Sequence, residues 1–426
     1  MRVHLDYGSD GLDVDVPDDR TEIVSPRHEP ALADPGAALA AALAAPIGRP
    51  PLGDLVGATH RVAISVCDIT RAQPRALMLE ALFAAMPAVR AENVTILVAT
   101  GTHRANTAEE LERMFGAPIV ERYRVVNHDA RDDSALAFAG RTASDVPVWL
   151  NRHWLDADVR ITTGFVEPHF FAGFSGGPKM VAPGLAGLAT TLVLHDARHI
   201  GHANATWGIT EGNPVHDDVR EIARMTGVHF AVDVALNRDQ AITRVFAGEL
   251  FAEHAAACTH VKETAMRSVA APFDIVVTTN SGYPLDQNLY QAVKGMSAAA
   301  CIVKPGGTII CAAECRDGIP DHGPYGQLLR QRQSPAGLLE MVEAQGFAEQ
   351  DGWQVQVQAL IQRKARVMVK AGGLTHDQLR AAHFEPITDL GMAVRQALGD
   401  AGADATMAVL PHGPQTIPYL APAPVD

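Results

Sequence analysis

The sequence is constrained most by a regular alternation of strand-like and helix-like segments between residues 61 and 137. The strand-like segments are short and rich in valine and isoleucine, and the helix-like segments between them are longer. The predicted strands are 61–67, 93–99 and 123–127, and the predicted helices are 74–83 and 107–115. This strand–helix–strand rhythm predicts a parallel sheet with helices on both faces.

The same type of pattern returns in the C-terminal part of the chain. A further strand is predicted near 157–163, a helical segment at 253–269, and a new α/β pattern opens at residue 273. It continues with a helix near 289–296 and with strands at 307–311, 365–369 and 407–410. Because 426 residues exceed what one ordinary core organises, we expect two domains.

The predicted fold class is therefore α/β, with two domains that are each built on a mostly parallel sheet flanked by helices. We expect the active site in the cleft between them. The N-terminal α/β domain, expected to bind a cofactor, is placed at 1–268, and the C-terminal α/β domain, expected to close over the substrate, at 269–404. The tail, about residues 405–426, is a candidate to return to the first domain.

The composition narrows the classes of partner. A formal net charge of −14 disfavours nucleic acids and anionic membranes, because binding to phosphates requires a positive field. No apolar run reaches the ~18–20 residues of a membrane span, and the N-terminus lacks the basic start and apolar core of a signal peptide. The five cysteines form no C-x-x-C pair, so we expect reduced thiols and a cytoplasmic location.

Polar and titratable side chains follow four of the predicted strands. Ligands of open α/β sheets bind at the carboxyl ends of strands, so these positions are candidates for a site. They are Asp68, Thr70 and Arg71 after 61–67, His103 and Arg104 after 93–99, His169 after 157–163, and Thr279–Gly282 after the first strand of the second domain. One polar strand end is more often a helix cap, but four together favour a site.

The segment His169–Gly184 is the most specific signal in the chain. Its glycines at 173, 176 and 177 would let backbone N–H groups approach an anion closely, as in loops that cradle phosphates. It is not a Walker loop, because a proline precedes Lys179 and a methionine follows it in place of the metal-binding Ser or Thr. No G-x-G-x-x-G occurs, so an ordinary NAD site has no fingerprint here.

Three histidines follow this segment, at His195, His199 and His202. Spacings of four and three would place them on one face of a helix, which suggests a zinc-dependent hydrolase as an alternative function. That alternative lacks an H-E-x-x-H pattern and a matching carboxylate, and for His199 and His202 we favour a supporting role. The third hypothesis is a non-catalytic module that binds a sugar acid or a nucleotide, but such a module would not need histidines at two strand ends.

Taken together, the motifs resemble those of the nickel-pincer-nucleotide lactate racemase family. The matching residues are Asp68-Ile-Thr70-Arg71, Gly101-Thr-His103-Arg104, the run from His169 to Lys179, His195 sixteen residues beyond that lysine, and Tyr290-Gln291-Ala-Val-Lys294. The resemblance is strong over roughly residues 60–300 and continues more weakly to the C-terminus. The main departures from the family pattern are Cys67 and Pro178.

The resemblance implies a covalent cofactor. Lys179 would hold a pyridinium mononucleotide as a thioamide, with nickel gripped by two sulfurs and one ring carbon. His195 would supply the fourth ligand of a near-planar site, a geometry that suits Ni(II). The other implied cofactor-binding residues are Asp68, Thr70, Arg71, Gly176 and Gly177. Enzymes that synthesise the cofactor are the implied protein partners.

The resemblance also implies the reaction, racemisation or epimerisation of a small 2-hydroxy acid. His103 and His169 would be the paired bases, and Arg71, Tyr290, Gln291 and Lys294 would bind the substrate. The chemistry agrees, because the α-hydrogen beside a carboxylate is poorly acidic but can leave as hydride while a base takes the hydroxyl proton. Neutral imidazoles suit that proton transfer. Asp68 could orient a histidine, contact the cofactor ribose, or cap the following helix.

Overall fold

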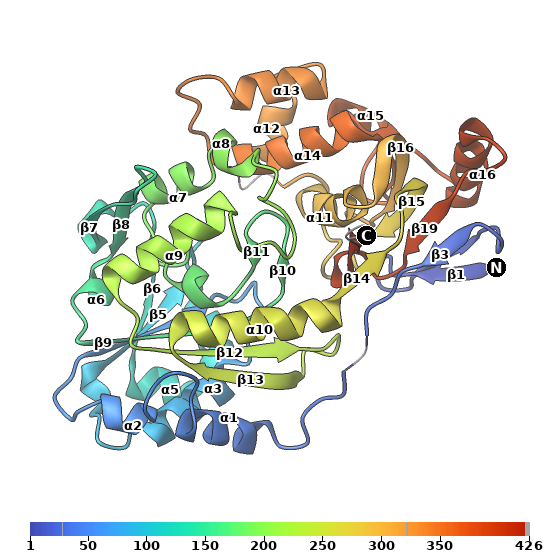
Figure 1. Ribbon diagram of the computed structural model, residues 1–426. Helices are drawn as coiled ribbons and strands as arrows, with labels where there is room; N and C mark the ends of the chain where they lie inside the picture. The colour runs from blue at the N-terminus through green and yellow to red at the C-terminus, as the bar shows by residue number, and fades with distance from the viewer. Residues whose placement is uncertain (28, 321–322, 422–426) are drawn as a thin grey trace, which may run out of the picture. The chain divides into compact units, whose positions relative to one another are not determined.

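The computed structural model describes residues 1–27, 29–320 and 323–421 (Figure 1). The chain divides into two compact units, and each unit is assembled from more than one segment of the sequence. The first unit comprises Met1–Arg27, Asp196–His202 and Glu263–Asp426, and the second comprises His28–His195 and Ala203–Lys262. In the part of the chain that is described, no helix is long and apolar enough to cross a membrane.

The second unit is built on a six-stranded sheet with the order β13-β12-β9-β4-β5-β6. All neighbouring strands are parallel except β12 and β13, which are antiparallel. The strands are β4 (Val62–Cys67), β5 (Val94–Ala99), β6 (Arg124–Asn127), β9 (Val159–Phe165), β12 (Phe230–Leu236) and β13 (Ile242–Gly248). The predicted alternation between residues 61 and 137 is thereby confirmed.

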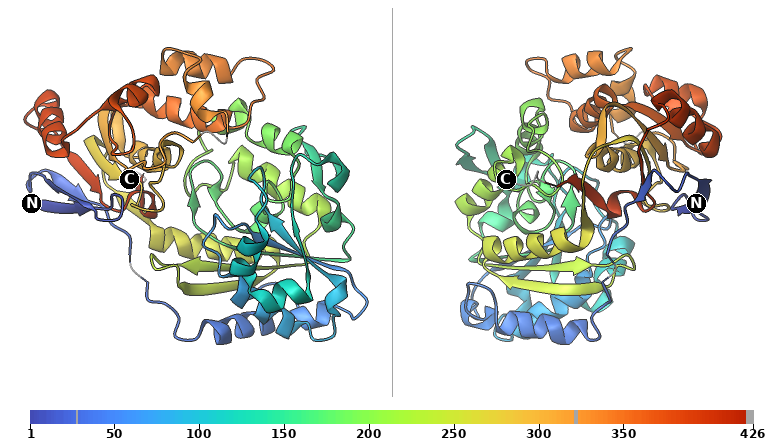
Figure 2. Two further views of the ribbon diagram at one scale, coloured as in Figure 1. Left: turned by 180° about the vertical axis from the view of Figure 1, so that it is seen from behind. Right: turned by 45° about the vertical axis from the view of Figure 1, so that its right-hand side comes forward.

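Helices cover both faces of this sheet, and the strands are correspondingly apolar on both sides. Val62, Ile64 and Val66 of β4 pack into a core with helices α1 and α3, whereas Ala63 packs on the opposite side. Figure 2 shows α1 along one face of the sheet and α10 along the other. The helices of this unit are α1 (Pro35–Ala44), α2 (Leu52–Leu55), α3 (Arg75–Ala85), α4 (Ala108–Phe115), α5 (Ala117–Arg122), α6 (Arg152–Leu155), α7 (Leu188–Leu194), α9 (Pro214–Thr226) and α10 (Leu250–Ala265).

The first unit is built on a second six-stranded sheet, which is parallel throughout, with the order β18-β17-β16-β15-β19-β3. Its strands are β3 (Thr21–Ile23), β15 (Phe273–Thr279), β16 (Val303–Ala312), β17 (Arg366–Lys370), β18 (Glu385–Pro386) and β19 (Met407–Leu410). Its helices are α8 (Ala197–Ile200), α11 (Leu289–Ala300), α12 (Tyr325–Leu329), α13 (Pro335–Val342), α14 (Gly352–Lys364), α15 (His376–Ala381) and α16 (Leu390–Ala401).

Small two-stranded sheets complete the two units. They pair β1 (Arg2–Leu5) with β2 (Leu12–Asp15), β7 (Leu136–Arg141) with β8 (Pro147–Asn151), β10 (Pro168–His169) with β11 (Gly173–Phe174), and β14 (Met266–Val269) with β20 (Ile417–Leu420). Single 3-10 turns lie at Ala91–Asn93, Asp133–Ala135, Gly177–Met180 and Gly413–Gln415.

The division of the chain differs from the predicted boundaries in two ways. The N-terminal segment groups with the C-terminal sheet, because β3 pairs with β19. The C-terminal tail does not return to the other unit, since β19 lies between β15 and β3 and β20 pairs with β14. All four residues of β19 are buried, and an apolar run of this kind does not indicate which of two sheets will accept it. The predicted helix at 253–269 ends at Ala265, and strand β14 follows it.

Candidate functional site

Three neighbouring strands of the second unit, β9, β4 and β5, end at the same edge of the sheet. The residues that follow them carry most of the predicted site: Asp68, Thr70 and Arg71 after β4, His103 after β5, and the segment from Gly164 to Lys179 after β9. The fourth predicted strand end, Thr279–Gly282, follows β15 and belongs to the other sheet. Of the four strand ends that were predicted as one group, three therefore belong to one sheet and the fourth belongs to the other.

Asp68 and His103 form a hydrogen-bonded pair at this edge. Asp68 is buried, and its Oδ2 lies 2.7 Å from His103 Nδ1. Thr70 Oγ1 donates to Asp68 Oδ1 at 2.7 Å, and Arg71 Nη1 donates to Thr70 Oγ1 at 3.4 Å. Burial acts to raise the pKa of Asp68, but the hydrogen bond and charge of His103, with Arg71 and Thr70, outweigh it, so the pKa lies below its usual value. Asp68 is thus a carboxylate that fixes the orientation of the His103 ring.

A buried arginine that the sequence did not single out shapes the turn around Asp68. Arg75 Nε donates to Cys67 O at 2.7 Å and Nη1 donates to Gln73 O at 3.1 Å. Its Nη2 also donates to the carbonyl oxygens of Asp68 and Arg71. One guanidinium thereby donates to four carbonyl groups of this turn, which a lysine with its compact ammonium group could not do.

The ring of Phe171 links three predicted site residues. His169 lies at 4.5 Å and His195 at 5.0 Å between ring centroids, and Lys179 Nζ lies 5.7 Å from the centroid of Phe171. His169 Nδ1 accepts from the N–H of Phe171 at 3.4 Å and of Ala172 at 3.2 Å. A neutral His169 therefore carries its proton on Nε2.

The segment that carries Lys179 is anchored to the same sheet edge as Asp68 and His103. Ser65 Oγ on β4 donates to Met180 O at 2.7 Å, and the N–H of Gly101, beyond β5, donates to Gly184 O at 3.0 Å. The structure thus places the Asp68–His103 pair and the Lys179 segment at one edge of the sheet.

The glycines before Lys179 allow close packing onto protein groups. Gly176 and Gly177 have φ values of +71° and +50°. A Cβ on Gly177 would lie 2.4 Å from His254 Cδ2, and one on Gly176 would lie 2.9 Å from Phe165 O. The N–H of Gly177 donates to Asp233 Oδ2 at 2.7 Å, so this donor serves the protein and is not turned to an external anion.

Two buried imidazoles lie near Lys179. His254 Nε2 lies 2.8 Å from Ser175 O, and the rings of His254 and His216 stack at 5.8 Å. Burial lowers the pKa of His216 to about 3 and that of His254 to about 4, and the nearby charges of Lys179 and Arg220 lower both further. Both rings are therefore neutral near pH 7. Among the residues that the structure describes, His216 Nδ1 has no hydrogen-bond partner.

The three histidines at 195, 199 and 202 do not share one helical face, contrary to the prediction. Helix α7 ends at Leu194, and Asp196 begins α8 by accepting from the N–H groups of Arg198 and His199. His199 is buried, and its Nδ1 lies 2.7 Å from Asp196 Oδ1. Over the described ranges, no group of three or more His, Cys, Asp and Glu side chains is arranged to hold a metal ion by itself. The capping aspartate between the first two histidines is the physical reason for the break.

The predicted substrate residues Tyr290, Gln291 and Lys294 lie together on α11 of the first unit. Asn288 caps this helix through the N–H of Gln291 at 3.0 Å. Trp353 Nε1 on α14 donates to Tyr290 Oη at 3.2 Å, which fixes the phenol. Positions 290 and 294 are one turn apart, so both side chains share a face of α11.

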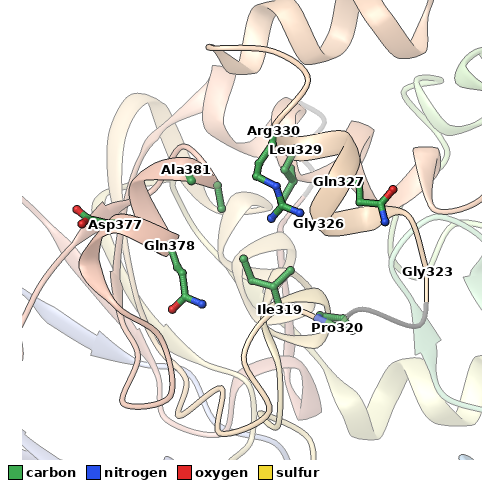
Figure 3. A pocket seen from close by; sticks show the side chains of 11 residues that line it. Ile319, Pro320, Gly323, Gly326, Gln327, Leu329, Arg330, Asp377, Gln378 and Ala381 are labelled. Atoms are coloured by element: carbon green, nitrogen blue, oxygen red, sulfur yellow. The ribbon is translucent and has the colours of Figure 1, made fainter.

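A separate pocket of about 430 Å³ lies in the first unit between α12 and α15 (Figure 3). Its polar lining includes Gln327, Arg330, Asp377 and Gln378. None of the predicted site residues lines this pocket, and none of its described lining residues is a histidine. We therefore do not assign it to the site.

Comparison with known proteins identifies the family. The chain matches the model for the lactate racemase N-terminal domain over residues 7–208 and the model for the lactate racemase C-terminal domain over residues 268–417. It is 33% identical over 422 residues to a lactate racemase of Thermoanaerobacterium thermosaccharolyticum, covering 97% of this chain and 98% of that protein. This chain belongs to the lactate racemase family.

A second relative and a solved structure agree with this assignment to the lactate racemase family. A lactate racemase of Lactiplantibacillus plantarum is 36% identical over 371 residues, covering 86% of this chain and 87% of that protein. The structure of the lactate racemase apoprotein from T. thermosaccharolyticum matches with a TM-score of 0.91 at 32% identity, covering 98% of this chain and 100% of that one. A Thermotoga maritima crystal structure, at 17% identity, TM-score 0.69 and coverage of 93% and 100%, shares the fold alone. The protein is thus an isomerase with the two-domain α/β fold of its family.

Sequence reasoning missed several polar residues around the site of this lactate racemase family member. Asp233 is a lone charged residue in the apolar strand FAVDVAL, which was a usable signal. Arg75 begins α3, where a positive charge opposes the helix dipole, and that was a weaker signal. Trp353 gave no signal, because its contact with Tyr290 joins residues 63 positions apart.

Proposed function

We propose that this racemase interconverts the enantiomers of a small 2-hydroxy carboxylate, with lactate as the first substrate to test. Lactate is the substrate in the names of both relatives that are at least 33% identical. The observation that carries the proposal is the grouping of Lys179, His169 and His195 around Phe171, on the sheet edge that also holds the Asp68–His103 pair.

The residues of this edge fit a nickel-pincer nucleotide. Lys179 offers an amine for a covalent link, and the imidazole of His195 is a donor that suits nickel. The buried His216 Nδ1, which lacks a partner among the described residues, offers a further polar contact. When bound, the group would supply a ring carbon that accepts the α-hydrogen of the substrate as hydride and returns it. Lys179 would hold it and His195 would bind its metal.

The two histidines are set up for opposite halves of a proton transfer. The Asp68 carboxylate only accepts, so the proton of a neutral His103 lies on Nδ1 and Nε2 presents a lone pair. His169 has the reverse tautomer, with its proton on Nε2. In one direction, His103 would thus take the hydroxyl proton of the starting enantiomer, and His169 would donate a proton to the same oxygen as the other enantiomer forms. The two histidines exchange these roles in the reverse direction.

Binding of the substrate carboxylate is assigned to cationic and amide groups. Arg71 beside Thr70 offers a planar fork for two carboxylate oxygens. Gln291 and Lys294 on α11 offer an amide and a point charge, with Tyr290 held by Trp353 beside them. Asp68 and Thr70 contribute indirectly, since their hydrogen bonds fix His103 and Arg71.

The decisive experiment addresses the link to Lys179. Protein produced together with the cofactor-synthesis enzymes should show added mass on the peptide that contains Lys179, and should retain nickel. Lys179→Arg keeps the positive charge but should lose both the added mass and racemase activity. Lys262→Arg, at an exposed lysine of α10, is the matched control and should keep both. An active Lys179→Arg variant would disprove the proposed link.

The hydride step has its own test. An α-deuterated substrate should keep most of its label through racemisation, because hydride does not exchange with water. Racemisation by simple deprotonation would release the label to solvent at each inversion. Deuterium loss at the rate of racemisation would refute the hydride step while leaving the attachment at Lys179 to be judged by mass.

A further inference from the structure

A buried pair of carboxyl groups, Asp233 and Glu253, lies beneath the loop that carries Lys179. Asp233 is in the middle of β12 and is 1% exposed, and Glu253 is in the first turn of α10 and is 0% exposed. Neither residue has a role in the proposed reaction. Burying two carboxyl groups side by side is costly unless at least one of them is neutral.

The hydrogen bonds show that the pair needs a proton. Asp233 Oδ2 accepts from the N–H of Gly177 at 2.7 Å. Glu253 contacts Asp233, but among the described residues no donor reaches either of its carboxylate oxygens. Two carboxylate oxygens can share a hydrogen bond only when one of them is protonated. A single proton between the two groups gives one oxygen of Glu253 a hydrogen bond and gives Asp233 a second donor.

The surroundings place that proton on Glu253. Asp233 has a backbone donor that stabilises its charged form, whereas none of the described residues donates to Glu253. Burial raises the pKa of Glu253 well above its usual value, and the charge of Asp233 raises it further. Burial also raises the pKa of Asp233, to about 7, against the lowering effect of its hydrogen bonds with Gly177 and Glu253.

Other titratable groups that face the pair do not neutralise it. The thiols of Cys67 on β4 and Cys258 on α10 both have raised pKa values because of burial, and Asp233 raises them further. Glu249 adds a negative charge near Glu253. Arg220 acts on the thiol of Cys258, whereas the pKa values of Asp233 and Glu253 are shifted by burial, by neighbouring carboxyl groups and, for Asp233, by the N–H of Gly177.

The pair is in direct contact with the loop that presents Lys179. A Cβ on Gly176 would lie 3.0 Å from Asp233 Oδ2, and one on Gly164 would lie 2.7 Å from Asp233 Oδ1. His254 also contacts the loop, with its Nε2 2.8 Å from Ser175 O. The Asp233 carboxylate is thus enclosed between two glycines and sets the position of the residue two before Lys179.

We propose that Asp233 and Glu253 share one proton, carried by Glu253, and that the resulting Asp233 carboxylate is a positioning group that holds the Gly176–Gly177 turn and thereby aims Lys179. The purpose of aiming Lys179 rests on the proposed function, but the shared proton does not. The two isosteric amide variants distinguish the two members of the pair. Glu253→Gln replaces a neutral acid by an amide that still donates to Asp233. Asp233→Asn removes the charge that holds Gly177.

The first test is infrared spectroscopy of the apoprotein at about pH 8, where ordinary carboxyl groups are ionised. The wild type should show the C=O stretch of a protonated, buried carboxyl group. Glu253→Gln should lose that band, and the control Asp217→Asn, at an exposed carboxylate of α9, should keep it. Absence of the band from the wild type, or its survival in Glu253→Gln, would overturn the shared proton.

The second test follows the reaction of Lys179 with an amine-selective reagent as a function of pH, with the exposed Lys262 as internal reference. The wild type and Glu253→Gln should show an inflection near pH 7 in addition to that of the lysine itself, from the ionisation of Asp233. Asp233→Asn should lose this inflection and should slow cofactor attachment by roughly tenfold, since a neutral acceptor forms a weaker hydrogen bond.

Three outcomes separate the inferences. If Asp233→Asn leaves the labelling of Lys179 and the attachment of the cofactor unchanged while Glu253→Gln impairs them, the proton is on Asp233, and its assignment to Glu253 is overturned. Equal, unaltered profiles in both variants would overturn the positioning role. A wild type that never carries mass on Lys179 would defeat the proposed function, while the infrared band and the labelling profile of the apoprotein would still decide the proposal about the pair.

Discussion

A methyl group added at Gly177 tests how tightly the Lys179 loop is packed. Gly177 has a φ of +50°, and the new Cβ of Gly177→Ala would lie 2.4 Å from His254 Cδ2 and 2.5 Å from its Cγ. The His254 ring cannot move aside freely, because its Nε2 lies 2.8 Å from Ser175 O and the ring is buried. The methyl group must therefore displace either the loop or the ring.

The cost can be worked from these contacts. A left-handed conformation costs a non-glycine residue about 1–2 kcal/mol. Overpacking by one buried carbon costs about 1–3 kcal/mol more. Gly177→Ala should thus lower the free energy of unfolding by about 2–5 kcal/mol, measured by urea unfolding of the apoprotein. Because the displaced turn is two residues from Lys179, the added mass on the lysine should also fall.

Gly48→Ala is the matched control for this experiment. Gly48 has a φ of +63°, and its new Cβ would meet only Glu249 Cβ at 3.4 Å and Ala252 Cβ at 4.0 Å. It should cost about 1–2 kcal/mol, from the backbone conformation alone. Equal losses of stability for the two variants, or a Gly177→Ala protein that attaches the cofactor normally, would refute the reasoning about the packed loop.

Three further predictions follow from the site. The pKa of Asp233 in the folded protein is about 7, above the usual 3.8. Its contribution to the free energy of unfolding is therefore present below about pH 4 and is lost as the pH rises through about 7. Asp233→Asn should remove this pH dependence, as urea unfolding across that range would show. His195→Ala should lose most of the retained nickel, whereas His199→Ala should retain it, as metal analysis of the purified proteins would show; equal loss would contradict a single histidine ligand. His103→Ala and His169→Ala should each lower racemisation in both directions by ~10²–10⁴-fold, and full activity in either variant would remove that histidine from the mechanism.

The sequence predicted the local parts of the structure well, because their signals are local. Strands β4 and β5 and helix α3 lie within two residues of the predicted ranges, since apolar runs and helical periodicity determine them directly. The order of the strands in each sheet was less accessible. Strand β3 is only three residues long, and nothing in it indicates that it extends the sheet formed by β15 and β19.

The predicted site shows the same division between local and distant information. The motifs Asp68–Arg71 and Gly101–Arg104 each follow a strand, so the contact between Asp68 and His103 could be anticipated from the parallel pairing of β4 and β5. The prediction that His195 and His199 share a helical face is wrong, because the Asp196 side chain accepts hydrogen bonds from backbone N–H groups and starts a new helix. Periodicity alone does not detect a cap inside an apparently continuous pattern.

The glycines before Lys179 contact a different group from the one that their sequence pattern predicts. Their pattern suggested a cradle for an external anion, and the group that the structure places at the N–H of Gly177 is the protein's own Asp233 carboxyl group. A carboxylate in a fully buried strand is expensive, so its presence implies a compensating partner nearby. Here the partners are a backbone N–H and a second carboxyl group, and both come from segments distant in sequence. The lone aspartate of β12 therefore indicates a polar contact of the Lys179 loop that the sequence of the loop itself does not indicate.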